Sequence, residues 1–280
     1  MEALGLRDAK PATSPAEEKK DHEEGDEVEL DAESSTKFRA LAARANFLAT
    51  DRADIQFAVK ELCRRMSRPL VGDKKKIKRL GRYLLHKPRM VQEYEWQGRA
   101  NEIDAFTDSD WAGCARTGKS TSGGVIRVGT HMIKSWCRTQ KTVALSSGEA
   151  ELTAMVKTTC EAIGISALMK DWGDEKEVLV FADSNAALGI MQRKGAGKLR
   201  HVRIGMLWLQ DAKEEGIRFN KVPGGENPAD LMTKALSGKS IEEHCKRLKI
   251  KHKAGRAEKA SKLSRGVNSF ALVKRFVEKC

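Results

Sequence analysis

The sequence has few aromatic residues, no closely paired cysteines and no long apolar run. Phenylalanine, tryptophan and tyrosine together make up 5% of its 280 residues. No uninterrupted apolar stretch approaches the roughly 20 residues that cross a bilayer. The opening MEALGLRDAK lacks the basic and apolar regions of a secretory signal. We therefore expect neither a secreted protein nor a membrane partner, and an intracellular location in the cytoplasm or the nucleus.

The cysteines give no sign of a disulfide framework or a zinc site. They stand at positions 63, 114, 137, 160, 245 and 280, without a Cys-x-x-Cys pair and without a histidine at zinc-ligand spacing. In a chain without a secretory signal, this pattern indicates ordinary reduced thiols.

Positive charge is abundant and unevenly distributed. The net charge is +13, but residues 1–36 carry 12 acidic and 4 basic residues, a balance of −8, which leaves +21 for the other 244 residues. A basic body favours a polyanionic partner, of which nucleic acid is the commonest. A solvated lysine-rich surface is the alternative.

Composition and periodicity divide the chain into four segments. These are a disordered acidic tail (1–36), a small basic helical segment (37–100), an α/β domain (101–236) and a basic, mostly flexible tail (237–280). In the helical segment, eleven basic residues and one acid, Asp73, lie between Arg64 and Arg89. A helical unit with one apolar and one basic face suits contact with a phosphate backbone, although charged faces are often simply solvated. The predicted nucleic-acid contacts in this segment are Lys74, Lys75, Lys76, Lys78, Arg79 and Arg82.

The segment 101–236 has the pattern of a mixed sheet. Three short apolar stretches between Ile103 and Trp136, separated by glycine-rich breaks, predict a strand meander. Strands near 178–181 and 217–222 then alternate with helices, the last of them predicted over 227–236. This order predicts an α/β fold with a mixed five-stranded sheet and flanking helices.

Four acidic residues lie at the ends of predicted elements. Asp108 follows the first strand, Glu151 lies one turn into the long helix, Asp183 ends the fourth strand and Asp230 opens the last helix. Ligand sites of open α/β sheets gather at such ends, although a polar residue there is also what an ordinary strand end looks like. If they converge without histidine or cysteine, four carboxylates suit Mg²⁺ or Mn²⁺.

These acids lie in sequence motifs that resemble the RNase H domain of copia-type LTR retrotransposon polyproteins. The motifs are TDSDWAG, KSTSGGVIRVGTHMIKSWCRTQKTVALSSGEAELTAM, FADSNAAL and VPGGENPADLMTKAL. Residues 37–96 resemble the segment that precedes RNase H there, through DRADIQFAVKELCRRMSRP and KKKIKRLGRYLLHKP. The resemblance covers about seventy percent of the chain and implies an RNase H-like domain behind a remnant of the reverse-transcriptase region.

The resemblance also implies an activity, its cofactors and its partners. The expected reaction is hydrolysis of RNA in RNA–DNA hybrids with two Mg²⁺ or Mn²⁺ ions, the partners being the hybrid and the polymerase part of a larger Pol polyprotein. Asp108 is expected to bridge both ions, Glu151 and Asp183 to complete one site, and Asp230 to hold the other. No Tyr-x-Asp-Asp word occurs, so no polymerase activity is expected. The alternatives are a catalytically silent nucleic-acid-binding relic and an inert fragment.

Two acidic neighbours compete for the same roles. Asp110 lies two residues beyond Asp108, and Glu149 lies two residues before Glu151. The family pattern favours the acid directly after the apolar strand and the acid directly before Leu-Thr-Ala. Because two residues on a helix differ by about 200°, Glu149 and Glu151 cannot both face the site.

Further nucleic-acid contacts are predicted beside the acids. The hydroxyls of Ser120, Thr121 and Ser122 suit a phosphate or the 2′-OH of RNA, a polar turn entering the second strand being the alternative. His201, in the word LRHVRIG, suits a substrate phosphate, with a helix-capping or packed histidine as the alternative.

Overall fold

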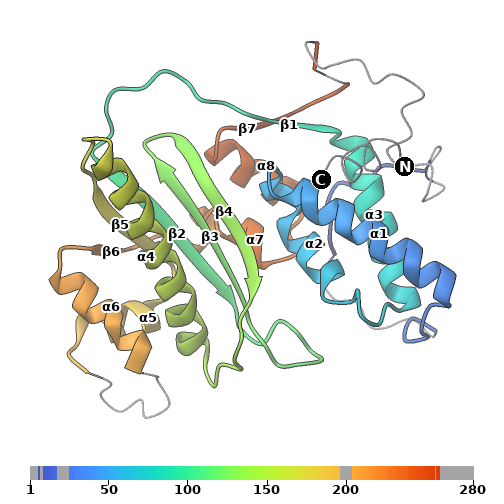
Figure 1. Cartoon of the computed structure of the whole chain (residues 1–280), viewed down its shortest axis with the longest axis horizontal. Helices are drawn as coiled ribbons and strands as arrows, with labels where there is room; N and C mark the ends of the chain where they lie inside the picture. The colour runs from blue at the N-terminus through green and yellow to red at the C-terminus, as the bar shows by residue number, and fades with distance from the viewer. Residues whose placement is uncertain (1–5, 7–8, 18–24, 196–203, 256, 259–280) are drawn as a thin grey trace, which may run out of the picture.

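The computed structural model of the chain describes residues 6, 9–17, 25–195, 204–255 and 257–258. A helical unit and an α/β unit lie against each other (Figure 1). The predicted contact residue His201 lies outside the described residues.

A mixed five-stranded sheet forms the centre of the α/β unit, in the order β4-β3-β2-β5-β6. Its strands are β2 (Glu102–Asp110), β3 (Thr121–Val128), β4 (His131–Thr139), β5 (Glu177–Ala182) and β6 (Arg218–Lys221). β2, β3 and β4 are antiparallel neighbours, whereas β5 and β6 run parallel to β2. The predicted α/β class, with a mixed five-stranded sheet and a preceding helical segment, is confirmed.

Strand β2 divides its side chains between the two faces of the sheet. Ile103 and Ala105 pack in one buried cluster, whereas Phe106 packs in another, as the two-residue period of a strand requires. The strand continues to Asp110, so Asp108, expected where the strand stops, lies inside it.

Helix α4 (Ser147–Asp171) covers one face of the sheet (Figure 1). Ser146 caps its start by accepting a hydrogen bond from the Glu149 amide at 3.2 Å. Among the described residues, α4 is the helix that is long and apolar enough to cross a membrane by length and composition. Its buried residues, Ala150, Leu152 and Met155 among them, lie inside the domain, as expected of a core helix.

The other face of the sheet is covered by short elements from distant parts of the chain. They are η2 (Ala53–Ile55), α7 (Asp230–Thr233) and α8 (Gly238–Arg247), whereas α5 (Asn185–Gln192) and α6 (Ile204–Glu214) pack against α4. Ala53, Phe106 and Met232 share one buried cluster. The helix predicted over 227–236 is therefore shorter than expected, because Asn227 and Pro228 form a turn before it and Lys234 is already extended.

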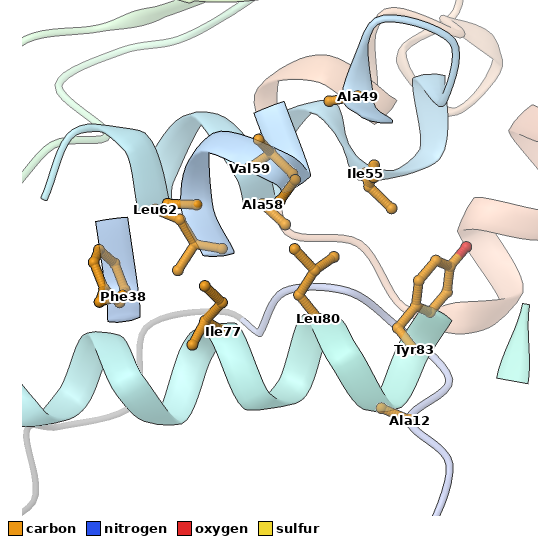
Figure 2. Packing of buried hydrophobic residues seen from close by; sticks show 12 residues of the cluster. Ala12, Phe38, Ala49, Ile55, Ala58, Val59, Leu62, Ile77, Leu80 and Tyr83 are labelled. Atoms are coloured by element: carbon orange, nitrogen blue, oxygen red, sulfur yellow. The ribbon is translucent and has the colours of Figure 1, made fainter. Parts of the chain in front are cut away.

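The helical unit has its own core, which Figure 2 shows. It is built from α1 (Ala32–Ala49), α2 (Gln56–Cys63) and α3 (Val71–His86). Phe38, Leu62, Ile77, Leu80 and Tyr83 meet between these helices. The helical segment expected from the apolar periodicity is thus present.

The described part of the N-terminal segment packs on the helices. Ala12 and Ser14 are buried, and the Ser14 hydroxyl accepts a hydrogen bond from Arg79 at 2.9 Å. Asp31 caps α1 by accepting from the Ser34 amide at 2.9 Å. These residues of the predicted disordered tail are therefore held by specific contacts.

The predicted mostly flexible tail 237–280 also needs correction. Its first part forms α8 and then β7 (Ile250–Lys253), which pairs with β1 (Arg89–Gln92). Ile241, Cys245 and Leu248 are buried in the core, which orders this part of the segment. Residues 259–280 lie outside the described residues.

A buried carboxylate joins the helical unit to β7. Asp54 accepts hydrogen bonds from Arg52 at 2.7 and 2.8 Å and from the Tyr83 hydroxyl at 2.8 Å, and the His252 ring lies 3.0 Å away. Although burial acts to raise the pKa of Asp54, these partners hold it well below its usual value. The network therefore favours an ionised, fully partnered carboxylate.

Replacing Tyr83 by phenylalanine removes one donor from this carboxylate. The variant should lose about 1.5 kcal/mol of unfolding free energy, since hydrogen bonds to charged groups contribute about that much. Urea unfolding measures the loss. Tyr94→Phe is the control, because that hydroxyl is exposed and reaches its acceptor, the Met132 carbonyl, at 3.4 Å. Equal stability of Tyr83→Phe and the wild type would contradict the prediction.

Candidate metal centre

Three carboxylates converge at one end of the central strands. Asp108, Asp183 and Asp230 each offer an oxygen, and these oxygens all lie within 4.8 Å of one another. The strand register brings two of them together, because Phe106 and Phe181 are paired neighbours whose rings stack at 4.9 Å. Asp108 stands two residues after Phe106, and Asp183 stands two residues after Phe181, so both acids lie on the same face as the two rings.

Helix α7 brings the third acid. Asn227 fixes its start by donating a hydrogen bond to the Thr107 carbonyl at 2.8 Å and accepting one from the Ala229 amide at 3.1 Å. At the other end of the helix, the Thr233 hydroxyl donates to the Asp108 carboxylate. Sequence reasoning did not single out Asn227 or Thr233, although both lie in the word VPGGENPADLMTKAL, where an Asn-Pro pair before a helix signals a capping turn.

Close packing of α7 on β3 depends on Gly123. A Cβ atom there would lie 2.6 Å from Met232 Cβ and 2.7 Å from Thr233 Cγ2. Gly123→Ala should therefore displace α7 and cost about 2 kcal/mol of unfolding free energy, as overpacking does. The control is Gly164→Ala, where the added methyl group meets nothing within 4 Å, and which should leave stability unchanged or slightly raised. Thermal unfolding compares the two, and equal effects would contradict the packing argument.

Glu151 reaches the same cluster from α4. Its side chain is 8% exposed, and within the described part of the chain its buried Oε2 has no hydrogen-bond partner. Burial, together with the charges of Asp108 and Asp183, raises the pKa of Glu151 to about 8. A buried oxygen without a partner, in a group that resists ionisation, indicates missing positive charge.

The pKa values of Asp230 and Asp183 are raised in the same way. Burial and the charge of Asp108 raise the pKa of Asp230 to about 6, although Lys234 opposes the shift. Burial and Asp108 also raise the pKa of Asp183. Asp108 is thus the acid whose charge acts on each of the other three.

The competing acids have different surroundings. Glu149 turns to the start of α4, where its Oε2 accepts a hydrogen bond from the Leu145 amide at 2.7 Å. The Asp110 carboxylate lies against Gly113 in the turn after β2, where a Cβ atom at position 113 would collide with it. The geometry therefore favours Asp108 and Glu151 over Asp110 and Glu149.

Lys234, which the sequence pattern did not indicate as a site residue, lies among the four acids. Lys234 Nζ is 2.8 Å from Asp230 Oδ1 and 3.3 Å from Asp108 Oδ2. Burial acts to lower the pKa of Lys234, but the two carboxylates outweigh it and raise the pKa. One ammonium faces four carboxylates. This set of hard oxygen donors with excess negative charge fits a divalent cation such as Mg²⁺ or Mn²⁺.

Known proteins similar to this chain include retrotransposon polyproteins, although no protein-family model matches it. The chain is 26% identical over 219 residues to the retrovirus-related Pol polyprotein from transposon RE1 of Arabidopsis thaliana, which covers 77% of this chain. It is 30% identical over 149 residues, 52% of its length, to the Pol polyprotein from transposon TNT 1-94 of Nicotiana tabacum. The chain is thus similar to one part of retrotransposon Pol polyproteins, as expected of a fragment of such a polyprotein. It spans 15% of the RE1 polyprotein and 11% of the TNT 1-94 polyprotein.

Among solved structures, the chain is similar to LC11-RNase H1, isolated from compost by a metagenomic approach. The match covers 51% of this chain and 97% of LC11-RNase H1, with 19% sequence identity and a TM-score of 0.39. This is a weak likeness.

The predicted serine and threonine contacts of this Pol segment are inside the protein. Ser120, Thr121 and Ser122 are 0%, 2% and 6% exposed. Their hydroxyls accept hydrogen bonds from the Ala112 amide, Lys60 Nζ and Gln140 Nε2, at 3.1, 2.8 and 2.9 Å. Their contact with nucleic acid stays a prediction, and in this structure the three hydroxyls are buried and occupied by internal partners. These hydrogen bonds join the start of β3 to Ala112, Lys60 and Gln140.

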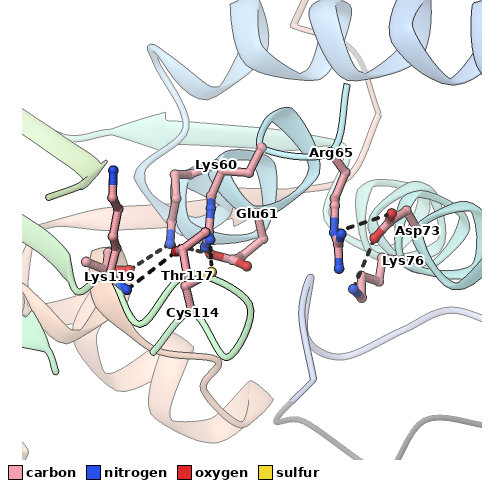
Figure 3. Close-up of polar contacts among 10 residues, drawn as sticks. Lys60, Glu61, Arg65, Asp73, Lys76, Cys114, Thr117 and Lys119 are labelled. Carbon is pink, nitrogen blue, oxygen red and sulfur yellow. Dashed lines mark hydrogen bonds and ion pairs between the residues drawn. The ribbon is translucent and has the colours of Figure 1, made fainter. Parts of the chain in front are cut away.

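The six basic residues predicted on the helical segment all lie on α3. Lys76 pairs with Asp73 at 3.1 Å, as Figure 3 shows, and Lys75 pairs with Asp26 at 2.8 Å. Arg79 pairs with Glu17, and Arg82 Nε donates to the Lys10 carbonyl at 2.6 Å. Lys74 and Lys78 are exposed. Nucleic-acid contact by α3 stays a prediction, and part of its basic face meets the N-terminal segment.

Figure 3 also shows how α2 meets the loop between β2 and β3. Lys60 and Glu61 form an ion pair beside the loop that carries Cys114 and Thr117. Burial acts to raise the pKa of the Cys114 thiol, but hydrogen bonds from Thr117 and the nearby Arg64 lower it to about 7. The helical unit therefore supports the loop that follows the acid-bearing strand.

Proposed function

We propose that this Pol segment is a metal-dependent endoribonuclease that hydrolyses the RNA strand of RNA–DNA hybrids. The observation that carries the proposal is the convergence of Asp108, Asp183 and Asp230, with Glu151 buried beside them. The similarity to retrotransposon Pol polyproteins and the excess of basic residues support the choice of a nucleic-acid substrate.

The four acids are the residues that would hold the metal. When bound, two divalent ions would activate a water molecule and stabilise the oxygen that leaves the scissile phosphate. Asp108 suits the shared position, because its charge acts on Glu151, Asp183 and Asp230 alike. Glu151 and Asp183 would complete one side and Asp230 the other. Products with 5′-phosphate and 3′-hydroxyl ends are expected.

Other residues of the chain hold these carboxylates in position. Thr233 donates to Asp108, and Asn227 holds α7 against β2, so the acids are set by packed elements and their hydrogen bonds. Such preorganisation reduces the reorganisation that the reaction must pay for. The net positive charge of the chain would attract a phosphate backbone without regard to sequence.

The test is cleavage of a labelled RNA–DNA hybrid by the purified full chain, with Mg²⁺, with Mn²⁺ and with EDTA. Metal-dependent cutting of the RNA strand, and no cutting of the same sequence as DNA duplex, is the expected result. Salt-sensitive hybrid binding without cutting in either metal would overturn the proposal in favour of a binding relic. Neither binding nor cutting would indicate an inert fragment.

A further inference from the structure

Lys234 already supplies positive charge to the proposed metal ligands. Its Nζ lies 2.8 Å from Asp230 Oδ1, and 3.3 and 3.4 Å from the two oxygens of Asp108. These are two of the three acids whose oxygens converge. Without such a charge, Asp108 and Asp230 would face each other in a largely buried site, and their repulsion would push α7 away from β2.

The ammonium group and a divalent ion compete for the same oxygens. A Mg²⁺ ion needs oxygen ligands at about 2.0–2.1 Å in a near-octahedral arrangement. An ammonium group hydrogen-bonded to Asp108 and Asp230 occupies the lone pairs that the ion needs, and the two cations repel each other. Both cannot hold the two carboxylates at once.

The position of Lys234 allows its side chain to move away from the carboxylates of Asp108 and Asp230. It follows the last residue of α7 in extended conformation, and its side chain is 39% exposed. A long, flexible side chain at the mouth of the site can turn to solvent without moving the helix. Asp108 would stay in place, held by Thr233 and the strand register, and Asp230 would keep its place at the start of α7.

We propose that Lys234 is the internal counter-ion of this site: it holds Asp108 and Asp230 together without metal and is displaced when a divalent ion binds. It thereby sets the metal concentration at which the site fills. This inference rests on the proposed metal-dependent function. Lys234 is a positioning residue, which acts through the two carboxylates.

The first experiment measures Mn²⁺ binding to the full chain by electron paramagnetic resonance. Lys234→Met, which keeps the length and removes the charge, should bind Mn²⁺ about tenfold more tightly or better, while Lys234→Arg stays near the wild type. Lys239→Met is the matched control, because that lysine is 88% exposed and its ion pair is with Glu243, which is not one of the four acids. Unchanged affinity of Lys234→Met would overturn the inference.

The second experiment needs no variant. Acetylation of each lysine in the wild-type chain is followed by mass spectrometry with and without Mg²⁺, with Lys239 as internal reference. Displacement predicts a severalfold faster reaction at Lys234 when Mg²⁺ is present, because the freed amine loses its two carboxylate partners. An unchanged rate in metal-bound protein would overturn the inference. If the wild type binds no Mn²⁺, the proposed function itself fails, and the two failures are thereby distinguished.

Discussion

Asp108→Asn should abolish cleavage of an RNA–DNA hybrid, with an expected loss of about a thousandfold or more, and leave hybrid binding within a few fold of the wild type. Asp108 is the acid whose charge acts on all three others, so its loss removes the shared ligand of the proposed ions. A metal ion contributes several kcal/mol of transition-state stabilisation, which corresponds to this loss of rate. Binding should survive, because the basic residues that we expect to contact the phosphate backbone are unchanged in this variant.

The matched control is Asp110→Asn, two residues along the same strand. Its carboxylate lies against the turn at Gly113, so cleavage should stay within a few fold of the wild type. Single-turnover cleavage and a filter-binding assay, each with all three proteins, measure rate and affinity separately. Retained cleavage by Asp108→Asn, or equal losses in the two variants, would remove Asp108 from the proposed centre.

Much of the α/β unit could be predicted because its signals are local. Strand alternation and helix caps are read from a few neighbouring residues, and the order of the elements follows from them. Local geometry also predicts that Glu149 and Glu151 cannot both face the site, since a helix separates two such side chains by about 200°. The preference for Glu151 comes from the family resemblance, and in the structure Glu149 accepts a hydrogen bond at the helix start instead.

The features that the sequence did not predict depend on contacts between distant segments. Ser120, Thr121 and Ser122 have the composition of an exposed polar turn, yet Lys60 from α2 and Gln140 after β4 cover them. The basic segment after Leu236 has little periodicity, and its order depends on the pairing of β7 with β1, about 160 residues earlier. The residues around Lys234 in the sequence give no sign of its role, because its contact with Asp108 forms only when α7 packs against β2.

Without metal, the protein should lose stability as the pH rises from 5 to 9, and Glu151 should account for much of the loss. Its pKa is about 8 in the folded chain against an ordinary 4.5, so the folded state binds this proton more tightly than the unfolded state. That contribution to stability is fully present below the ordinary pKa and is lost as the pH rises through 8. Asp230, with a pKa raised to about 6, acts in the same direction. The expected loss from Glu151 is on the order of 3 kcal/mol.

Glu151→Gln isolates this contribution from those of other titrating groups. Glutamine resembles the protonated acid, so the variant should match the wild type at pH 5 and exceed its stability by about 3 kcal/mol at pH 9, in EDTA. Glu149→Gln is the control and should follow the wild type at every pH, because that side chain serves the helix start. Urea unfolding across the pH range measures the differences. Parallel curves for Glu151→Gln and the wild type would show that Glu151 ionises without cost, and would remove the argument that the site lacks a cation.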